Sequence, residues 1–443
     1  MATDGDKRFD ELYLWLLEDP AAPRLVGELR LADKGVSLRY ASSWLRSGFA
    51  LSEDLPLVDI EQLPRPREEV AVGAVDDARP DRWGERVIRY IDRPGRLSLM
   101  EYLYYAGDER FGAMGVSTSA TEYLPRTVGP LPRLQNVQAL SEIISKIKAK
   151  QPITAVERKM VAAGGSFGGA KPKALIEIER EQWVIKFFNN EPIDVPLVEH
   201  ATMTLCAKAG ITVAETRVVP LLGENAIAVR RFDRKGSARA HCISAGTALR
   251  ATVPTNEQPD MSYPNLAQLL RRAGQNTDNE NRLEMAELFR RMVFNILIDN
   301  TDDHEKNHSL LVTPRSDAKR PTSRVNGFRL APAYDVVPTN SGQGHHEFGI
   351  GDEGRDGTLS NAMSKCQSFG LSAAEAAAEV LRVIQGVDGW KEHFRACGVS
   401  PSDIDELAQR IDGEELLEQR QGFRAEDYTE QVRKRKRSPF SNG

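Results

Sequence analysis

The stretch that decides the fold covers residues 294–311 and reads Phe-Asn-Ile-Leu-Ile-Asp-Asn-Thr-Asp-Asp-His-Glu-Lys-Asn-His-Ser-Leu-Leu. Just before and into it, apolar side chains recur every three or four residues from Met285 to Ile296, which predicts one buried face of a helix. The helix end runs into a dense polar cluster. Such a cluster is either a turn that caps the helix or a loop that carries chemistry. Its members are Asn300, Asp302, Asp303, His304, Lys306 and Asn307.

Asp302 and Asn307 form the first candidate site. They stand five residues apart, as do the catalytic-loop aspartate and the metal-binding asparagine of protein kinases. In kinase chemistry a carboxylate accepts or orients the proton of an attacking hydroxyl, and a neutral oxygen ligand holds Mg²⁺. A divalent-metal hydrolase built on Asp302, Asp303 and His304 is a further interpretation. On the kinase interpretation Asp303 has no role of its own.

A second acidic position, Asp335, follows an apolar stretch. It lies 28 positions beyond Asn307 in the sequence Leu-Ala-Pro-Ala-Tyr-Asp-Val-Val-Pro, residues 330–338. A Mg²⁺ ion that bridges ATP phosphates takes a charged oxygen ligand beside the asparagine. We therefore predict that Asp335 is a metal ligand, with a simple turn before Val-Val-Pro as the alternative.

A glycine-rich segment at residues 163–173 reads Ala-Gly-Gly-Ser-Phe-Gly-Gly-Ala-Lys-Pro-Lys. Glycines let the backbone approach phosphate closely, and consecutive amides can surround an anion. The segment is not a Walker A motif, because no Gly-Lys-Ser/Thr closes it. Alone, it is equally compatible with a hairpin that holds no ligand.

Lys186 lies inside an apolar strand, Trp-Val-Ile-Lys-Phe at residues 183–187. A charge there needs a partner, and in kinases the strand lysine binds the α/β-phosphates. A lysine that extends to the sheet edge is the alternative. Glu199 on the following helix is a candidate partner for Lys186. Residues 228–234 end a later strand and are a candidate hinge for adenine.

The composition indicates a soluble globular protein. The 443 residues include 40% hydrophobic and 28% charged residues, with a net charge of −5, so the overall charge gives no argument for nucleic-acid binding. No signal peptide or membrane-spanning run is expected. The cysteines, Cys206, Cys242, Cys366 and Cys397, show neither metal nor redox spacing. Unpaired thiols favour a reducing compartment, so we expect a cytoplasmic protein without membrane contact.

Periodicity divides the chain into a β-rich first half and a helical second half. We expect a β-rich domain with helices at 1–125, a nucleotide-binding domain at 136–235, a helical domain at 236–430 and a basic tail at 431–443. Residues 314–327 contain Pro, Ser and Arg and are expected to form an exposed connector. Strands are predicted at 174–179, 183–188, 216–220 and 226–231, and helices at 83–90, 97–105, 195–209, 373–384 and 404–411.

In these features the chain resembles the HipA family of serine/threonine kinases, the toxin components of bacterial toxin–antitoxin modules. The resemblance runs from about residue 10 to 415 and implies an α+β, bilobal protein-kinase-like fold. That fold has a β-rich N-terminal lobe with an extra N-terminal subdomain and an all-helical C-terminal lobe. The stretches that carry the resemblance are 13–16, 26–29, 80–84, 108–113, 166–173, 231–234, 300–307 and 334–338.

The resemblance also implies roles for individual residues. Asp302 is the implied catalytic aspartate, Asn307 and Asp335 the Mg²⁺ ligands, and Lys186 the residue that holds the α/β-phosphates. Ser166 stands where the family's autophosphorylated serine lies, and a phosphate there would repel ATP. The other residues implied to bind ATP are Gly168, Gly169, Ala170, Lys171, Pro172, Lys173, Arg230, Arg231, Phe232, His304, Lys306 and Tyr334.

For the whole protein, the resemblance implies a toxin kinase that uses ATP and Mg²⁺ to phosphorylate a serine of a protein target, with an aminoacyl-tRNA synthetase as the best-known kind. Growth would then stop. The implied partner is a HipB-like helix-turn-helix antitoxin, and DNA contact would occur mainly through it. The basic tail is a solvated terminus or a weak contact to a partner.

The chain departs from the family pattern at two places, and two functions other than that of a toxin kinase are also considered. The segment 241–246 lacks the acidic residues expected after His241, and Lys171-Pro172 replaces a more usual Gln-x pair. The first departure predicts different substrate docking. One alternative is a catalytically idle co-repressor that acts with a DNA-binding antitoxin. The other is a metal-dependent nuclease, which gives no role to the glycine-rich segment or Lys186.

Overall fold

The computed structural model describes residues 8–65, 70–126, 129–162, 171–188, 191–254, 256–317, 320–339 and 344–428. The predicted α+β class is confirmed, because the chain combines antiparallel sheets with helices. Two compact units each use three stretches of chain, whereas the predicted domains were continuous. The first unit comprises Met1–Asn190, Glu215–Pro259 and Ser309–Ala331. The second comprises Glu191–Ala214, Asp260–His308 and Pro332–Gly443.

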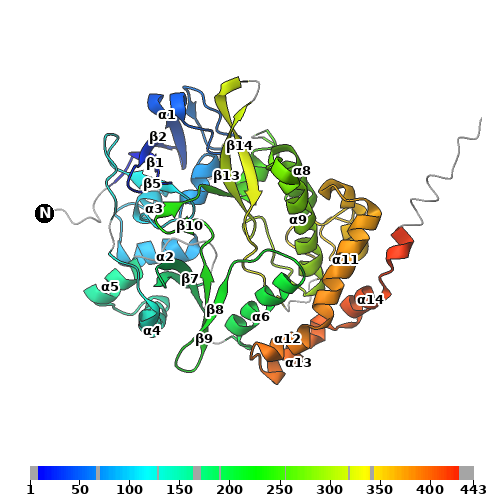
Figure 1. The fold of residues 1–443 in the computed structure, drawn as a ribbon. Helices are drawn as coiled ribbons and strands as arrows, with labels where there is room; N and C mark the ends of the chain where they lie inside the picture. Colours follow the sequence, from blue (N-terminus) through cyan, green and yellow to red (C-terminus); the bar gives the residue numbers. More distant parts are fainter. Residues whose placement is uncertain are drawn as a thin grey trace, which may run out of the picture. The chain divides into compact units, whose positions relative to one another are not determined.

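The first unit begins with a five-stranded antiparallel sheet in the order β4-β3-β2-β1-β5 (Figure 1). Alternating apolar residues place Leu12 and Leu14 in the core. The two predicted helices near the sheet are confirmed, with the second closed at its start by a Ser98–Glu101 capping box. The elements are β1 (Glu11–Leu16), β2 (Arg24–Ala32), β3 (Gly35–Tyr40), α1 (Ser42–Ser47), β4 (Glu61–Gln62), α2 (Arg82–Ile91), α3 (Leu99–Tyr105) and β5 (Met114–Ser117).

A second antiparallel sheet in the first unit has the order β6-β7-β9-β8. Its strands confirm the four predicted for the nucleotide-binding region: β6 (Lys173–Ile178), β7 (Glu181–Phe187), β8 (Thr216–Pro220) and β9 (Asn225–Arg230). Helices α2, α4 (Val137–Lys148) and α5 (Ala155–Ala162) contribute apolar side chains to the same core as this sheet (Figure 1). Burial of Trp83, Ile144 and Ile185 in that core removes apolar area from water and holds the sheet to its helices.

A three-stranded sheet of β12, β13 and β14 shows that the predicted exposed connector at residues 314–327 was wrong. Residues 314–327, expected to be a connector, belong to the antiparallel hairpin of β13 (Ser309–Asp317) and β14 (Arg320–Leu330), and β12 (Cys242–Ser244) pairs with β13. The connector prediction was wrong because polar side chains and prolines do not prevent pairing in a two-stranded ribbon, where prolines are tolerated at outer positions. Pro314 pairs opposite Asn326. The hairpin belongs to the first unit, together with α7 (Ala245–Arg250).

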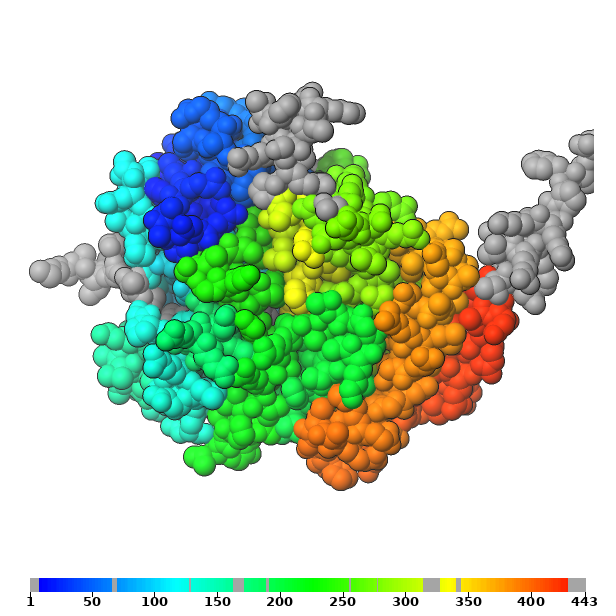
Figure 2. Space-filling view, viewed as in Figure 1, coloured from blue at the N-terminus to red at the C-terminus, as the bar shows by residue number. Residues whose placement is uncertain are grey.

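Helices build the second unit, and its described residues form only isolated β-bridges besides them. The predicted face of α9 (Glu280–Leu297) is confirmed, because its residues from Met285 to Ile296 at the expected spacing are buried. From α11 onward the helices form one continuous patch of this unit's surface, in orange and red (Figure 2). The other helices are α6 (Val195–Lys208), α8 (Tyr263–Ala273), α10 (Leu359–Ser364), α11 (Ala373–Asp388), α12 (Trp390–Ala396), α13 (Pro401–Ile411) and α14 (Glu414–Gly422).

Helix α6 begins and ends as its sequence predicts. The Asp194 side chain accepts a hydrogen bond from the Leu197 backbone N–H at 3.1 Å, and Pro196 occupies the first turn. Gly210 follows the helix with a φ of +80°, a conformation that glycine adopts at little cost. The predicted boundary at Gly210 is therefore confirmed. The predicted basic tail at 431–443 lies outside the described residues.

A buried charge network joins distant segments of the first unit around the Asp233 carboxylate. The carboxylate accepts hydrogen bonds from Arg231 Nε (2.9 Å) and Nη2 (2.7 Å), from Arg234 Nη1 (2.9 Å) and from the Gly112 backbone N–H (2.8 Å). Both guanidinium groups also donate to the Arg110 carbonyl oxygen at 2.9 Å. Segments 108–113 and 231–234, which the sequence analysis singled out, are therefore structural partners.

The charges of this network persist at neutral pH. Burial alone would raise the pKa of Asp233, but the adjacent Arg231 and Arg234 lower it to about 2. Burial lowers the pKa of Arg234 to about 9, so its guanidinium remains protonated. The buried carboxylate therefore carries a negative charge that both arginines compensate.

We predict that Asp233→Asn destabilises the first unit, because two buried guanidinium groups lose their nearest counter-charge and keep only Glu109, 3.8 Å from each. Removing one partner from a buried ionic pair costs about 3–5 kcal/mol. Urea unfolding followed by tryptophan fluorescence measures the change. Glu179→Gln, which removes the exposed carboxylate paired with Arg217, is the control and should leave the midpoint nearly unchanged. Equal midpoints for Asp233→Asn and the native chain would contradict the proposed importance of the network.

Candidate active site

The loop that carries Asp302 begins where α9 ends. Asp299 adopts a φ of +58°, and the Asn300 backbone N–H donates to the Asn295 carbonyl oxygen at 2.9 Å, which closes the helix end. Asp302 is exposed, whereas Asn307 is buried in a turn in which its N–H donates to the His304 carbonyl oxygen at 2.9 Å. Asp302 thus lies on the surface beyond the helix end, and its role in the chemistry stays a prediction.

Asp303 turns in the opposite direction and is buried. His308 Nε2 lies 2.8 Å from Asp303 Oδ2, and the Tyr263 hydroxyl donates to the same oxygen. Burial alone would raise the pKa of Asp303, but the His308 imidazole and the hydrogen bonds from His308 and Tyr263 hold it below its usual range. Burial and the adjacent Asp303 raise the pKa of Tyr263, so its hydroxyl remains a donor.

The Asp335 segment is joined to this loop on both sides of Asp335. Tyr334 donates its hydroxyl hydrogen to the Lys306 carbonyl oxygen at 2.7 Å. On the other side, Thr339 Oγ1 accepts hydrogen bonds from the Thr301 and Asp302 backbone N–H groups at 3.0 and 3.3 Å. The second unit thus brings Asp335 to the same loop cluster as Asp302 and Asn307.

The backbone at Asp335 is in the left-handed region. Its φ of +59° is uncommon for a residue with a side chain and costs on the order of 1–3 kcal/mol. The segment tolerates this conformation because Ala333 is fixed by two backbone hydrogen bonds of 2.8 Å, to Thr212 and from Ala214. Strain of this kind occurs at functional sites, where the surrounding structure compensates for it.

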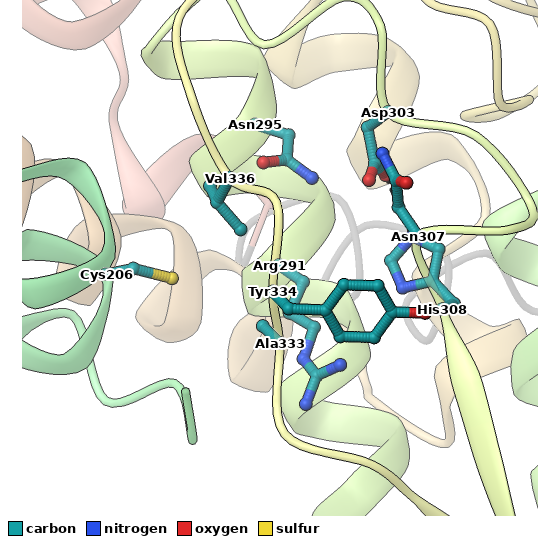
Figure 3. Close-up of a pocket in the computed structure, with 9 residues that line it drawn as sticks. All are labelled: Cys206, Arg291, Asn295, Asp303, Asn307, His308, Ala333, Tyr334 and Val336. Atoms are coloured by element: carbon teal, nitrogen blue, oxygen red, sulfur yellow. Dashed lines mark hydrogen bonds and ion pairs between the residues drawn. The ribbon is translucent and has the colours of Figure 1, made fainter. Parts of the chain in front are cut away.

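A small polar cavity lies beside Asn307 within the second unit (Figure 3). It has room for about one water molecule and is therefore far too small for a nucleotide. Tyr334 and Val336 line it from the Asp335 segment, while Arg291 and Asn295 reach it from α9 (Figure 3). The remaining lining residues are Cys206, Asp303, Asn307, His308 and Ala333.

In the first unit, the structure places Lys173 and Lys186 opposite each other on β6 and β7, both buried. Lys173 Nζ lies 3.7 Å from Asp81 Oδ2. Burial raises the pKa of Asp81 to about 6, although Lys173 acts in the opposite direction. Lys173 therefore has a protein partner, and its contact with ATP stays a prediction, as does the pairing of Lys186 with Glu199.

The remaining residues predicted to bind ATP in the first unit are spread around the ends of β6, β7 and β9. Lys171 Nζ lies 4.5 Å from the centre of the Phe188 ring, and the Pro172 carbonyl oxygen accepts a hydrogen bond from the Phe187 N–H at 2.9 Å. Arg230 is exposed and forms ion pairs with glutamates. Ser166, Gly168, Gly169 and Ala170 lie outside the described residues.

The predicted adenine-facing residues have different surroundings. The Arg231 guanidinium is buried and engaged by Asp233, whereas Phe232 is half-buried with its ring centre 6.3 Å from that of Phe111. Contact of these residues with adenine stays a prediction. His241 is a core residue: its Nε2 lies 3.0 Å from the Leu51 carbonyl oxygen, and burial lowers its pKa to about 4.

The residues that support the candidate site were not predicted from the sequence. Tyr263, Asn295, His308 and Thr339 have no assigned chemistry in a kinase motif, and Asp303 was left without a role. One signal for Asp303 and His308 was present in the sequence. Each is adjacent to a candidate site residue, Asp303 to Asp302 and His308 to Asn307. For Thr339 the sequence holds no comparable signal, because its importance depends on which backbone amides it meets.

The metal-hydrolase interpretation does not fit this geometry. It requires Asp302, Asp303 and His304 to face one ion, yet Asp302 is exposed and Asp303 points to buried donors. Among the residues that the structure describes, no group of three or more His, Cys, Asp or Glu side chains is arranged to hold a metal ion. Within the same residues, none of the helices combines the length and apolar character required to cross a membrane.

Two curated relatives share part of the sequence: "Putative kinase Y4dM" of Sinorhizobium fredii is 30% identical over 169 residues, and "Putative kinase" of Haemophilus influenzae is 27% identical over 197 residues. The matches cover 35% and 39% of this chain, and 37% and 52% of the relatives. The chain thus spans about half the length of these relatives or less.

A solved structure covers nearly the whole chain. The HipA toxin of Shewanella oneidensis, solved with HipB and operator DNA, matches 96% of this chain and 99% of its own, with a TM-score of 0.61 and 18% identity. This similarity shows the fold. Family models described as "HipA N-terminal domain" and "HipA-like C-terminal domain" match residues 21–117 and 165–390. Because the second model alone matches half of the chain, the chain belongs to the HipA family.

Proposed function

We propose that this chain is a HipA-like protein kinase that transfers the γ-phosphoryl group of ATP to a serine hydroxyl of a protein. The observation that carries the proposal is the loop cluster of the second unit. Asp302 is exposed there, and the Asp335 segment is hydrogen-bonded to the loop at two places. Thr339 accepts from the Thr301 and Asp302 backbone N–H groups, and Tyr334 donates to the Lys306 carbonyl oxygen. An exposed carboxylate beside two oxygen ligands is the arrangement that phosphoryl transfer to a hydroxyl requires.

The residues of the cluster divide the chemistry among them. Asp302 accepts the proton of the serine hydroxyl as its oxygen bonds to the γ-phosphorus, and the bond from that phosphorus to the bridging oxygen breaks to release ADP. Asn307 and Asp335 offer amide and carboxylate oxygens, the hard ligands that Mg²⁺ prefers. Bound Mg²⁺ neutralises charge on the transferred group. Lys186, buried on β7, is proposed to hold the α/β-phosphates.

The substrate and partners are proposed from the family resemblance. The target is a protein serine, with an aminoacyl-tRNA synthetase as the best-known kind, and its phosphorylation in the cytoplasm would stop growth. The Shewanella oneidensis HipA was solved with HipB and operator DNA. By analogy, we propose a helix-turn-helix antitoxin as partner here and DNA contact through it. His241 is buried, and a different substrate docking caused by the departure at 241–246 stays a prediction.

We predict that Asp302→Gln abolishes phosphoryl transfer because no carboxylate is left to accept the hydroxyl proton. Loss of a positioned general base lowers the rate by on the order of 10²–10⁴-fold. Transfer of label from γ-labelled ATP to protein measures the effect, and growth after induction reports it in cells. Asp405→Gln, which changes an exposed aspartate on α13, is the matched control and should behave as the native chain does.

Equal labelling and equal growth arrest by Asp302→Gln and the native chain would overturn the kinase proposal. Growth arrest or repression that persists in Asp302→Gln without any labelling would instead support the second candidate, an idle co-repressor that acts with its antitoxin on DNA. The observation that favours the co-repressor as a second candidate is that the Shewanella oneidensis HipA was solved with HipB and operator DNA.

We also predict that the purified protein gains one phosphate on Ser166 when incubated with Mg-ATP. The added charge of nearly −2 would repel the nucleotide phosphates and slow further transfer. Intact-mass measurement and peptide mass spectra locate the modification. Ser166→Ala and Asp302→Gln should both remain unmodified, the first for lack of the hydroxyl and the second for lack of the base. Spectra of the active protein without a phosphate at Ser166 would rule out the switch.

A further inference from the structure

The loop that carries the proposed catalytic and metal-binding residues is closed by a buried pair. Asp303 directly follows Asp302, and His308 directly follows Asn307, so the pair encloses residues 304–307 and each member is adjacent to one proposed site residue. His308 Nε2 and Asp303 Oδ2 are 2.8 Å apart, and each side chain is 3% exposed. A hydrogen bond of this length between buried groups permits little variation in the separation of the two loop ends.

The pair is itself fastened to elements outside the loop. Tyr263, on α8, donates to the same oxygen of Asp303 and accepts a hydrogen bond from Asn295 Nδ2, on α9, at 2.9 Å. The Asn295 side-chain oxygen in turn accepts a hydrogen bond from Asn300 Nδ2 at 3.1 Å. Two helices therefore hold the Asp303 end of the loop in place.

Aromatic packing holds the other end. The His308 ring stacks on Phe348 with ring centres 5.4 Å apart and an interplanar angle of 25°, and Tyr263 meets both rings edge-on at 5.3 and 4.8 Å. Because the ionised Asp303 carboxylate can only accept, His308 must carry a hydrogen on Nε2. Its Nδ1 has no hydrogen-bond partner among the described residues, and His308 lines the small polar cavity.

We infer that Asp303 and His308 are positioning residues, whose hydrogen bond sets the placement of Asp302 relative to Asn307. The inference rests on the proposed phosphoryl transfer. Neither residue touches the reacting atoms: both are buried and turned toward α8, α9 and Phe348. Their effect reaches the chemistry through the backbone, because each is covalently adjacent to a residue that acts. A displacement of about 1 Å in a catalytic group can reduce a rate by on the order of 10²-fold.

The pair thus has a role that folding alone does not require. Where a buried polar pair serves only stability, replacing both partners by apolar groups of similar shape is close to neutral. A positioning pair behaves differently, because the apolar replacement restores packing but no longer fixes the distance between the loop ends. The double variant Asp303→Leu/His308→Phe therefore separates stability from positioning.

The test compares four variants of the full chain with the native protein. His308→Phe removes the donor but keeps a ring that can stack on Phe348, and His308→Gln keeps an N–H near the Nε2 position. Asp303→Leu/His308→Phe removes the whole pair. His241→Phe, which alters a buried histidine of the first unit, is the matched control. Each is measured for thermal midpoint, kcat, KM for ATP and the Mg²⁺ concentration that gives half-maximal activity.

We expect His308→Phe to lower kcat at least about tenfold and to raise the required Mg²⁺ concentration several-fold, because Asn307 moves with residue 308. His308→Gln should recover most of both. The double variant no longer buries a carboxylate that lacks its histidine donor, so it should unfold at a higher temperature than His308→Phe, although the Tyr263 hydroxyl loses its acceptor. It should not recover kcat. His241→Phe should change stability only. Native kcat and Mg²⁺ requirement in His308→Phe, or full recovery of kcat in the double variant, would overturn the positioning role.

A second measurement keeps this inference separate from the proposed function. Hydrogen–deuterium exchange of the peptide spanning residues 299–308 reports loop closure without any activity. We expect faster exchange there in His308→Phe, and native exchange in His308→Gln and His241→Phe. If the native protein transfers no phosphate, the proposed function fails, and exchange alone then decides the loop closure. Unchanged exchange in His308→Phe would refute the closure itself.

Discussion

The structure of the site depends on the burial of one carboxylate. An ionised carboxylate in a protein interior loses several kcal/mol of hydration, so it is stable only where donors replace the water. Asp303 finds its donors on His308, five residues ahead, and on Tyr263, on another helix. Since these donors come from different segments, only one arrangement of α8, α9 and the loop satisfies the charge. The neighbours Asp302 and Asn307 are covalently joined to this pair, so the backbone contributes to their placement.

The first unit uses the same physical solution. There the Asp233 carboxylate is buried, and its donors are Arg231, Arg234 and the Gly112 N–H, which lies more than a hundred residues away in sequence. In both units a single buried acceptor collects donors that only the folded chain brings together. Such networks stabilise one arrangement strongly because an unpaired member would be costly, whereas apolar contacts alone tolerate several arrangements of similar energy.

Much of the fold could be predicted from sequence, whereas the chemical roles of the candidate site residues stay predictions. Strands β6 to β9 and helices α6 and α9 were expected within a few residues of their observed bounds, because alternation and three-and-four spacing directly reflect which side faces a core. The grouping of Asp302, Asn307 and Asp335 followed from spacing. Hairpin β13–β14 was missed because its prolines and polar residues resemble a loop, while strand pairing in a two-stranded ribbon depends on backbone hydrogen bonds.

The supporting residues could not be predicted, for a different reason. Whether Asp303, Tyr263 or Thr339 is buried and paired depends on residues that lie up to 40 positions away in sequence, and no local pattern records such a pairing. Lys173 illustrates the reverse case: the motif assigned it to a ligand, whereas the structure gives it Asp81 as a buried neighbour. Sequence patterns therefore identify candidate reacting residues more readily than they identify the residues that hold those side chains in position.

Exposure divides the loop in a way that follows from its task. A group that accepts a proton from a protein substrate must be accessible, so Asp302 cannot be fixed by burying it. The chain instead buries the next residue, Asp303, and fixes the other side of the loop through His308 and Phe348. One side chain cannot be both accessible and rigidly buried. Here Asp302 is accessible, and the adjacent Asp303 is buried and fixed by hydrogen bonds. On the proposed function, substitutions at 302 should change the chemistry with little effect on the fold, whereas those at 303 and 308 should change the geometry while leaving every reacting group present.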